Sequence, residues 1–462
     1  MTPTLWLIAA YMAVQLGIGI WVSRRIHTEA DYLIAGRRLG YSLATFSIFA
    51  TWFGAETIIG SSGTVYSEGV SFASAEPFGY GLCLVLMGLV FAVPLWRRKL
   101  TTLADLFRQR FSPTVERVAA IILIPSSILW AAAQVRAFGH VVSAASAIEL
   151  EVAIGVAAAA TIAYTVVGGL MVDAITDLIQ GTILIIGLFA IGLMTVVTLG
   201  GPADAVDAIR VSGALAAGQA ARPGLLESIE AWAIPVCGSV LATELVGRVI
   251  ATRSPEVARR SSIAAGGIYL VVGTIPVFVG LAGVGMGLEL ADPEQLMPVV
   301  AASILPTLAY AVFAGGLISA ILSTVDSTLL IASGLLSHNL IVPALRSPDE
   351  RTKVRIARGG VLAFGVVAYV LALRAEGVFA LVEQASAFGS AGTLVAVCFG
   401  LFTGLGGPRT ALATLLVGIV AYLSGLLLGF PYPFLLSLAA SLATYVVGGL
   451  GGGIRAVRST AR

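Results

Sequence analysis

The feature that most constrains this chain is a series of long apolar stretches, each close to the roughly 20 residues that an α-helix needs to cross a bilayer. The stretches are continuous and do not alternate with polar residues, which excludes an outer-membrane β-barrel. Of the 462 residues, 58% are hydrophobic and only 11% are charged, so the chain lacks the polar residues that a soluble domain of this size needs for its surface. The sequence therefore predicts an all-α polytopic membrane protein.

The apolar stretches predict about 13 transmembrane helices. The first has no basic segment before it and no small-residue cleavage site after it, so we interpret it as a retained helix and not as a signal peptide. The stretch 307–343 is longer than a straight span and is expected to tilt or protrude. The predicted spans are 3–23, 41–67, 74–96, 115–143, 150–171, 176–199, 226–251, 261–289, 307–343, 354–374, 378–405, 409–428 and 432–450.

The basic residues favour one orientation of these spans. Most of the 27 Lys and Arg residues lie in alternate loops, such as 97–99 and 351–358, and in the C-terminal tail. Acidic residues such as Asp204 and Glu294 gather in the other loops. Because basic loops stay in the cytoplasm, this asymmetry predicts a multi-pass protein of the plasma (inner) membrane, with the N-terminus outside and the C-terminus cytoplasmic.

Composition and motifs exclude several classes of function. The formal net charge of +2 gives no reason to expect nucleic acid as a partner. Cys83, Cys237 and Cys398 lie far apart in apolar runs, which favours packing over a disulfide or a zinc site. Walker A, GxSxG and HExxH patterns are absent from the sequence, so neither ATP-driven transport nor a hydrolase is indicated. We expect the bilayer and a small solute as partners, with no organic cofactor and no obligate protein partner.

Ionisable residues inside predicted spans are candidates for function, because burying charge in a bilayer is costly. Glu56 and Asp326 lie deepest. Glu76, Arg136, Asp177 and Arg248 lie nearer span ends, where an interfacial position remains an alternative. The full set is Glu56, Glu76, Arg136, Asp177, Glu244, Arg248, Asp326 and Glu383.

Two segments have the composition of an ion site. The segment 50–63, ATWFGAETIIGSSG, contains three glycines and several hydroxyl residues that weaken a helix in mid-membrane, and a break there would free backbone carbonyls for a cation. The segment 318–328, ISAILSTVDST, supplies hydroxyls of the kind that suit Na⁺. The alternatives are close helix packing for the first segment and hydroxyls bonded to their own helix for the second.

These segments resemble the sodium:solute symporter family, and the likeness extends over nearly the whole chain. The most specific pieces are ATWFGAETIIGSSGTVYSEG (50–69), YTVVGGLMVDAITDLIQ (164–180), GRVIATRSPEVARR (247–260) and LISAILSTVDSTLLIAS (317–333). The resemblance implies one transporter domain, 1–462, with the LeuT-type fold of two inverted five-helix repeats and extra flanking helices. On this basis 1–40 is a leading helix and inner loop, 41–199 and 226–405 are the two repeats, and 409–462 holds two trailing helices and an inner tail.

The resemblance also implies an ion site. In this family Na⁺ is bound by carbonyls of the first broken helix and by one carbonyl and two hydroxyls of a later helix. The matching positions are Ala50 and Phe53, then Ala320, Ser323 and Thr324. A second ion site or an inner exit path is assigned to Asp177, Ser319 and Asp326.

Within the family, the aromatic residues are similar to the choline cage of the high-affinity choline transporters. Trp52, Tyr80 and Trp130 match cage positions, whereas Ala242 stands where a further tryptophan is expected, with Glu244 close by. Packing within the membrane is the alternative for each ring. The residues assigned to the substrate site are Trp52, Glu56, Thr57, Tyr80, Trp130, Gln134, Ala242 and Glu244.

The sequence thus predicts a transporter, not an enzyme, that uses Na⁺ to import a small organic solute by alternating access. The cage positions favour a solute with an ammonium group: a choline-like amine, an amino acid or another zwitterion. A neutral or anionic solute such as a sugar or carboxylate remains an alternative, as does proton coupling through a buried glutamate. A membrane sensor is the last alternative, although we expect no fused signalling module because the chain ends soon after its last predicted span.

Overall fold

The structure is a computed structural model that describes residues 13, 14, 17, 20, 21 and 27–460, apart from 72–73, 146–147, 168, 212, 214–222, 291 and 376. Helices make up nearly all of the regular structure in this part of the chain. The only pairing of extended backbone recorded there is an isolated bridge between Leu39 and Thr252. The described residues therefore confirm the all-α prediction.

The helices up to residue 211 belong to the part of the chain predicted as the leading segment and first repeat. They are α2 (Glu29–Ile34), η1 (Ala35–Arg37), α3 (Tyr41–Trp52), η2 (Glu56–Gly60), α4 (Ser61–Glu68), α5 (Phe78–Leu86), η3 (Met87–Phe91), α6 (Ala92–Arg97), α7 (Ala104–Arg110), α8 (Pro113–Ala145), α9 (Leu150–Val167), α10 (Leu170–Thr198) and α11 (Pro202–Val211).

The later helices cover the predicted second repeat and the trailing segment. They are α13 (Leu225–Ala233), η4 (Ile234–Gly238), α14 (Thr243–Ile250), α15 (Pro255–Gly285), η5 (Pro293–Gln295), α16 (Leu296–Ile304), α17 (Thr307–Gly334), η6 (Leu335–Ile341), η7 (Val342–Ala344), α18 (Glu350–Arg374), α19 (Val378–Ala387), α20 (Ser390–Phe402), α21 (Pro408–Leu427) and α22 (Pro433–Thr460).

Ten helices of the described chain are long and apolar enough to cross a membrane, or 11 if the bent pair α3 and η2–α4 is one span. The predicted span 3–23 lies mostly outside the described residues. The predicted span 150–171 corresponds to α9, whose apolar portion Leu150–Ala163 is shorter than a full crossing. The count of 13 therefore stays a prediction, whereas the long stretch is confirmed as one element, Thr307–Ala344.

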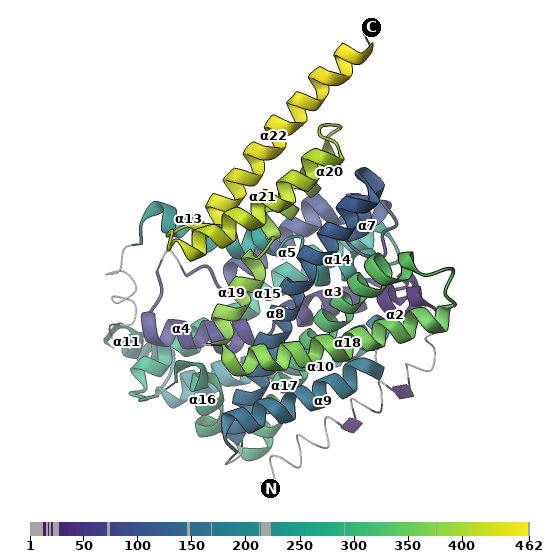
Figure 1. The fold of residues 1–462 in the computed structure, drawn as a ribbon. Coiled ribbons are helices and arrows are strands. Elements are labelled where there is room, and N and C mark those ends of the chain that lie inside the picture. Colours follow the sequence, from purple (N-terminus) through teal and green to yellow (C-terminus); the bar gives the residue numbers. More distant parts are fainter. Residues whose placement is uncertain are drawn as a thin grey trace.

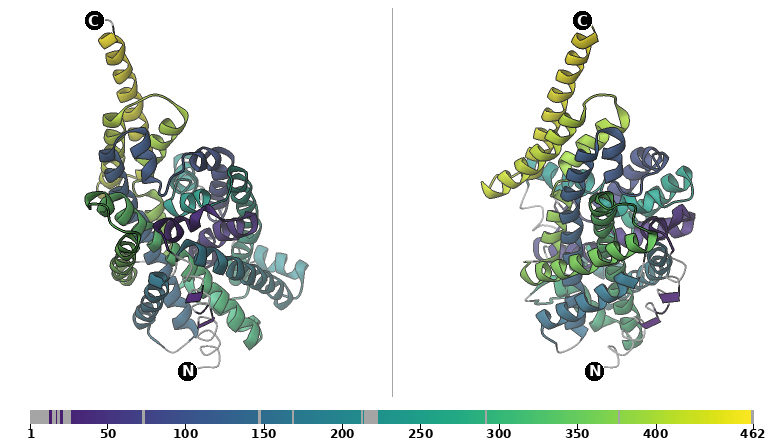
Figure 2. Two further views of the ribbon diagram at one scale, coloured as in Figure 1. Left: turned by 90° about the vertical axis from the view of Figure 1, so that its right-hand side faces the viewer. Right: turned by 45° about the vertical axis from the view of Figure 1, so that its right-hand side comes forward.

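The helices that run through the middle of the molecule are α8 and α17. The two pack against each other, and α8 also contacts α9, α18 and α19 (Figure 1). Helices α21 and α22 pack together at one edge, and α22 projects beyond the rest of the bundle in all three views (Figures 1 and 2).

The outer faces of the long helices are apolar, as lipid contact requires. Along α10, Ile186, Leu193 and Val197 are more than half exposed, whereas Leu188 and Ile191 on the opposite face are fully buried. A soluble protein rarely leaves such a stripe uncovered. The exposed face therefore supports the membrane assignment.

Two spans are interrupted at mid-length. The helix axis bends by 52° between α3 and η2. The stretch Leu225–Ile250 is also broken, because a turn at 239–242 separates η4 from α14. The first of these breaks was predicted from the glycines and hydroxyl residues of 50–63. The breaks stand at the start of 41–199 and 226–405, and the division into inverted repeats remains a prediction.

Candidate functional site

Side chains hold open the break that follows α3. In a continuous helix, the N–H groups of Gly54 and Ala55 would bond to the carbonyls of Ala50 and Thr51. Here Gly54 N donates instead to Glu56 Oε1 at 3.2 Å, and Ala55 N donates to Gln134 Oε1 at 3.0 Å. The break therefore frees the Ala50 and Thr51 carbonyls from these helical donors, as an ion site at a broken helix requires.

Glu56 and Gln134 form a closed pair at this break. Gln134 Nε2, from α8, donates to Glu56 Oε2 at 2.7 Å, and both side chains are fully buried. A Cβ on Gly54 would lie 2.6 Å from Glu56 Oε2, so only glycine leaves room for the pair. Both residues were assigned to the substrate site, and the structure places them against the backbone of the break.

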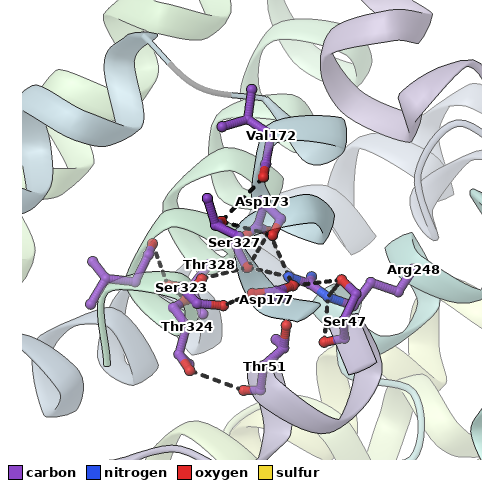
Figure 3. A network of polar contacts seen from close by, with 12 residues as sticks. Ser47, Thr51, Val172, Asp173, Asp177, Arg248, Ser323, Thr324, Ser327 and Thr328 are labelled. Atoms are coloured by element: carbon purple, nitrogen blue, oxygen red, sulfur yellow. Dashed lines mark hydrogen bonds and ion pairs between the residues drawn. The ribbon is translucent and has the colours of Figure 1, made fainter. Parts of the chain in front are cut away.

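The hydroxyl residues of α17 face the freed carbonyls. Thr324 Oγ1 lies 3.1 Å from the Thr51 carbonyl and 3.1 Å from the carbonyl of Ala320 on its own helix (Figure 3). Ser323 Oγ donates to Asp177 Oδ1. Ala50, Phe53, Ala320, Ser323 and Thr324 are all buried. The end of α3 and the hydroxyls of α17 are thus adjacent, which is the arrangement that the predicted Na⁺ site needs.

A buried ionic cluster lies beside these hydroxyls (Figure 3). Arg248 of α14 places Nη2 2.6 Å from Asp173 Oδ2 and 3.6 Å from Asp177 Oδ2, and all three side chains are fully buried. Arg248 Nε donates to Ser47 Oγ at 3.0 Å, and Ser47 Oγ donates to Asp177 Oδ2 at 2.6 Å. Ser327 Oγ donates to Asp173 Oδ2 at 2.6 Å. Neither Asp177 nor Arg248 has a side chain that reaches the surface of the protein.

Asp173 was not among the predicted intramembrane residues, because it falls in the gap left between two predicted spans. The signal was present in the spacing: Asp173 and Asp177 are four residues apart and share one face of α10. Two carboxylates on one buried helix face indicate that a positively charged group lies between them, and this group is the guanidinium of Arg248.

Of the remaining ion-path candidates, Asp326 is fully buried on α17. Neither of its carboxyl oxygens has a hydrogen-bond partner among the described residues. Ser319 lies in α17, but its side chain is outside what the structure describes. An unpaired buried carboxyl group is costly, so Asp326 is a position that a cation or a proton would stabilise.

The three aromatic residues of the predicted cage lie together and are buried. The ring centroids of Trp52 and Trp130 are 5.2 Å apart, and those of Tyr80 and Trp130 are 5.9 Å apart. The indole N–H groups of Trp52 and Trp130 have no hydrogen-bond partner in the described chain. Trp130 lines a small cavity of about 20 Å³ together with Ala242. The rings are in contact with one another, and this cavity is too small for an organic solute.

Glu244 is not part of the lining of this small cavity. Its carboxylate accepts hydrogen bonds from Ser127 Oγ and, at 3.2 Å, from Thr243 Oγ1. It is buried and does not line the cavity beside Ala242. The structure therefore brings Ala242 to the rings but leaves Glu244 engaged with neighbouring hydroxyls.

Thr57 belongs to a second polar cluster, one turn beyond the break. Thr57 Oγ1 donates to Glu76 Oε1 at 2.6 Å and contacts the hydroxyl of Tyr269 from α15, which itself lies 3.2 Å from Glu76 Oε1. Glu76 was singled out in the sequence but not assigned to the site. Its proximity to Thr57, 19 residues earlier, depends on how α4 packs against α15 and could not be read from the sequence.

A broken helix with freed carbonyls, facing hydroxyls across the middle of a helical membrane bundle, defines a cation-coupled secondary transporter. The model of the sodium:solute symporter family matches residues 32–418, and the chain belongs to this family. Membership makes the protein a transporter and not an enzyme, as the sequence predicted.

Relatives in the family differ in their solutes. The chain is 27% identical to the human high affinity choline transporter 1 over 404 residues, which cover 81% of this chain and 68% of the relative. It is 26% identical to the human sodium-coupled monocarboxylate transporter 1, covering 83% and 66% of the two chains. It is also 26% identical to the sodium/proline symporter of Haemophilus influenzae, covering 90% and 87%.

Solved structures agree on the fold. The structure of a Na⁺-coupled sialic acid symporter in a substrate-bound, outward-open state has a TM-score of 0.83 at 19% identity and covers 97% of both chains. The nucleobase-cation-symport-1 family transporter Mhp1 in a closed conformation has a TM-score of 0.60 at 14% identity, covering 94% of this chain and 96% of that one.

Proposed function

We propose that this protein is a Na⁺-coupled symporter that imports a small organic solute bearing an ammonium group, by alternating access. One observation supports the coupling ion above the others: the Gly54 and Ala55 N–H groups are diverted to side chains, which frees carbonyls opposite Ser323 and Thr324. Backbone carbonyls and hydroxyls are the hard oxygen ligands that suit Na⁺.

The hydrogen bonds of the two hydroxyls are compatible with ion binding. A hydroxyl oxygen has two lone pairs and one hydrogen, so it can donate to a neighbour and coordinate a cation at once. Ser323 donates to Asp177, and Thr324 donates to a backbone carbonyl. With these hydrogens engaged, the oxygen lone pairs of both residues are available to Na⁺.

The test is transport by the Ser323→Ala, Thr324→Ala double variant in proteoliposomes. We expect the Na⁺ concentration for half-maximal uptake to rise by about tenfold or more, because two of the five proposed ligands are lost. The matched control is Thr328→Ala: its hydroxyl lies one turn further along α17 and bonds only to carbonyls of the same helix, at 2.9 Å to Thr324 O and 2.9 Å to Val325 O. Equal Na⁺ dependence in the double variant and the control would refute the assignment.

A second candidate is coupling to a proton in place of Na⁺, and the carboxyl group of Asp326, whose oxygens have no hydrogen-bond partner in the described chain, favours it. Asp326→Asn keeps the shape and removes the titration. If uptake depends on a proton, a pH gradient will drive accumulation without Na⁺, and this variant will abolish that accumulation. If Asp326 lies on an ion path instead, the variant will change Na⁺ dependence alone.

A further inference from the structure

A cavity of about 180 Å³ lies near the broken helices and reaches the surface beside the α4–α5 connection. Its walls come from α4, from the segment around α13 and η4, and from α19. Apolar side chains such as Val65, Ile234 and Phe379 form much of the wall. Tyr80 also lines it, so the cavity adjoins the aromatic cluster.

The charged residues that line this cavity in the described part of the chain are all acidic. They are Glu68, Glu76 and Glu383, and no described lysine, arginine or histidine lines it. Glu68 and Glu383 are exposed at the rim, whereas Glu76 is 8% exposed and lies at the inner end beside Thr57 and Tyr269. Low-dielectric walls around charges of one sign concentrate the field, so the cavity attracts cations.

One carboxylate oxygen of Glu76 accepts no hydrogen bond from the described residues. Oε1 accepts from Thr57 at 2.6 Å and from Tyr269 at 3.2 Å. Oε2 is buried and has no hydrogen-bond partner in the described part of the chain, and no basic side chain there forms an ion pair with this carboxylate. A buried carboxylate without a counter-charge is costly, and a half-satisfied one at the end of an open cavity is a binding group for a ligand.

We propose that Glu76 is the counter-ion for the positively charged nitrogen of the solute. This inference rests on the proposed symport function and specifies the chemical class of the solute, an organic cation or a zwitterion with an ammonium group. Glu244, which the sequence analysis assigned to the substrate site, is a weaker candidate because its carboxylate already accepts hydrogen bonds from Ser127 and Thr243. Tyr80 presents an aromatic ring to the same cavity, and such rings attract ammonium groups through their faces.

The probes are choline and its uncharged isostere, 3,3-dimethylbutan-1-ol, together with propylamine as a primary amine. Each is tested by thermal shift on the purified full chain in saturating Na⁺. We expect the wild type to be stabilised by at least one of the two ammonium probes and not by the uncharged isostere. Failure of both cations, or equal stabilisation by the isostere, overturns the proposal.

The variant is Glu76→Gln, which retains the acceptor oxygen for Thr57 and removes the charge. We expect the half-saturating concentration of the cation to rise by about tenfold or more, because truncating one partner of a buried charge pair is expensive. The matched controls are Glu68→Gln and Glu383→Gln at the rim, where screening limits the change to about two- to threefold. A Glu76→Gln protein that binds the cation within twofold of wild type overturns the proposal.

The Na⁺ response separates this inference from the proposed function. Na⁺ alone should stabilise wild type and Glu76→Gln to the same extent, because Glu76 is not among the proposed Na⁺ ligands. If Na⁺ stabilises neither protein, the symport proposal fails, whatever the cation does. Should Glu76→Gln not fold, Glu76→Asp retains the charge but withdraws it by one methylene, and a cation affinity unchanged from wild type would then count against the counter-ion role.

Discussion

Single residues at the broken helix determine whether the proposed ion site can form. Glycine at position 54 leaves room for Glu56 and Gln134 to accept hydrogen bonds from the Gly54 and Ala55 N–H groups, which have no helical acceptor at the break. Without these acceptors, buried N–H groups would favour a return to continuous helix, because an unsatisfied donor in the bilayer costs several kcal/mol. The side chains of the break therefore maintain the carbonyl positions indirectly.

Gly54→Ala should weaken Na⁺ binding. The added methyl would lie 2.6 Å from Glu56 Oε2 and 3.0 Å from Gln134 Oε1, and relieving such overlap costs about 1–3 kcal/mol. We expect the Na⁺ constant for uptake to rise by about five- to a hundredfold. The control is Gly60→Ala in the same segment, whose added methyl would lie 3.5 Å from Phe379, an ordinary contact. Equal behaviour of the two variants would contradict the role given to Gly54.

Arg248 is expected to be a stabilising residue that lysine cannot replace. Its Nε and Nη2 groups donate in different directions, to Ser47 and to Asp173, and a lysine ammonium is a single point charge. Arg248→Ala should destabilise the protein by about 3–5 kcal/mol, because it leaves buried carboxylates unpaired. Unfolding in detergent, with exposed Arg253→Ala as control, measures this difference, and a loss below about 1 kcal/mol would contradict it.

At the scale of elements, the sequence predicted more of the backbone than of the contacts. The break after α3 was predicted from the glycines of 50–63, because glycine acts on the local backbone. The Asp173–Arg248 pair was not visible, since it joins α10 to α14 across 75 residues and nothing in either segment encodes their proximity. For the same reason the partners of Glu76 and Glu244 became known only from the packing of the helices.

The contact between α7 and η6 gives a pH prediction for Asp105, which lies outside all of the predicted spans. Asp105 Oδ2 accepts from Thr101 N at 2.7 Å, and Oδ1 lies 3.3 Å from His338 Nε2. Burial raises the pKa of Asp105. Several other effects lower it: the hydrogen bond and the charge of His338, and hydrogen bonds from the Thr101 and Thr102 N–H groups. Together these outweigh burial, so the pKa of Asp105 is below its ordinary value of 3.8. A lowered pKa means that the carboxylate stabilises the fold above about pH 4 and loses this contribution as the pH falls through its folded-state pKa.

Asp105→Asn should therefore lower the unfolding temperature at pH 7 by an amount that stays constant down to about pH 5 and shrinks below about pH 4. A loss of about 1–3 kcal/mol is expected for a charged hydrogen-bond acceptor. Asp207→Asn serves as the control, because Asp207 is exposed and its pair with Arg210 is a surface contact of little energy. A pH-independent difference, or one that grows in acid, would contradict the assignment.

For the whole molecule, the proposed coupling makes transport electrogenic. One Na⁺ moving inward gains about 2.3 kcal/mol per 100 mV, and a cationic solute adds the same amount. We expect an inside-negative potassium diffusion potential to accelerate Na⁺-dependent uptake in proteoliposomes, and a reversed potential to slow it. Uptake that ignores the potential would require compensating charge movement, which the proposal does not include.

Arg248 has a consequence for where the molecule can flex. Its guanidinium links α14 to α3 through Ser47, to α10 through Asp173 and to α17 through Ser327. The Arg248 and Asp173 side chains are fully buried, so water cannot replace these contacts when they break. Separating α14 from α10 would leave Arg248 and Asp173 as unpaired buried charges, whereas separation from α3 or α17 would remove a hydrogen bond to a serine hydroxyl. We therefore expect α14 to move together with α10 for as long as the Arg248–Asp173 pair is intact, and we expect bending during a transport cycle to occur at the breaks, around residues 53–55 and 239–242.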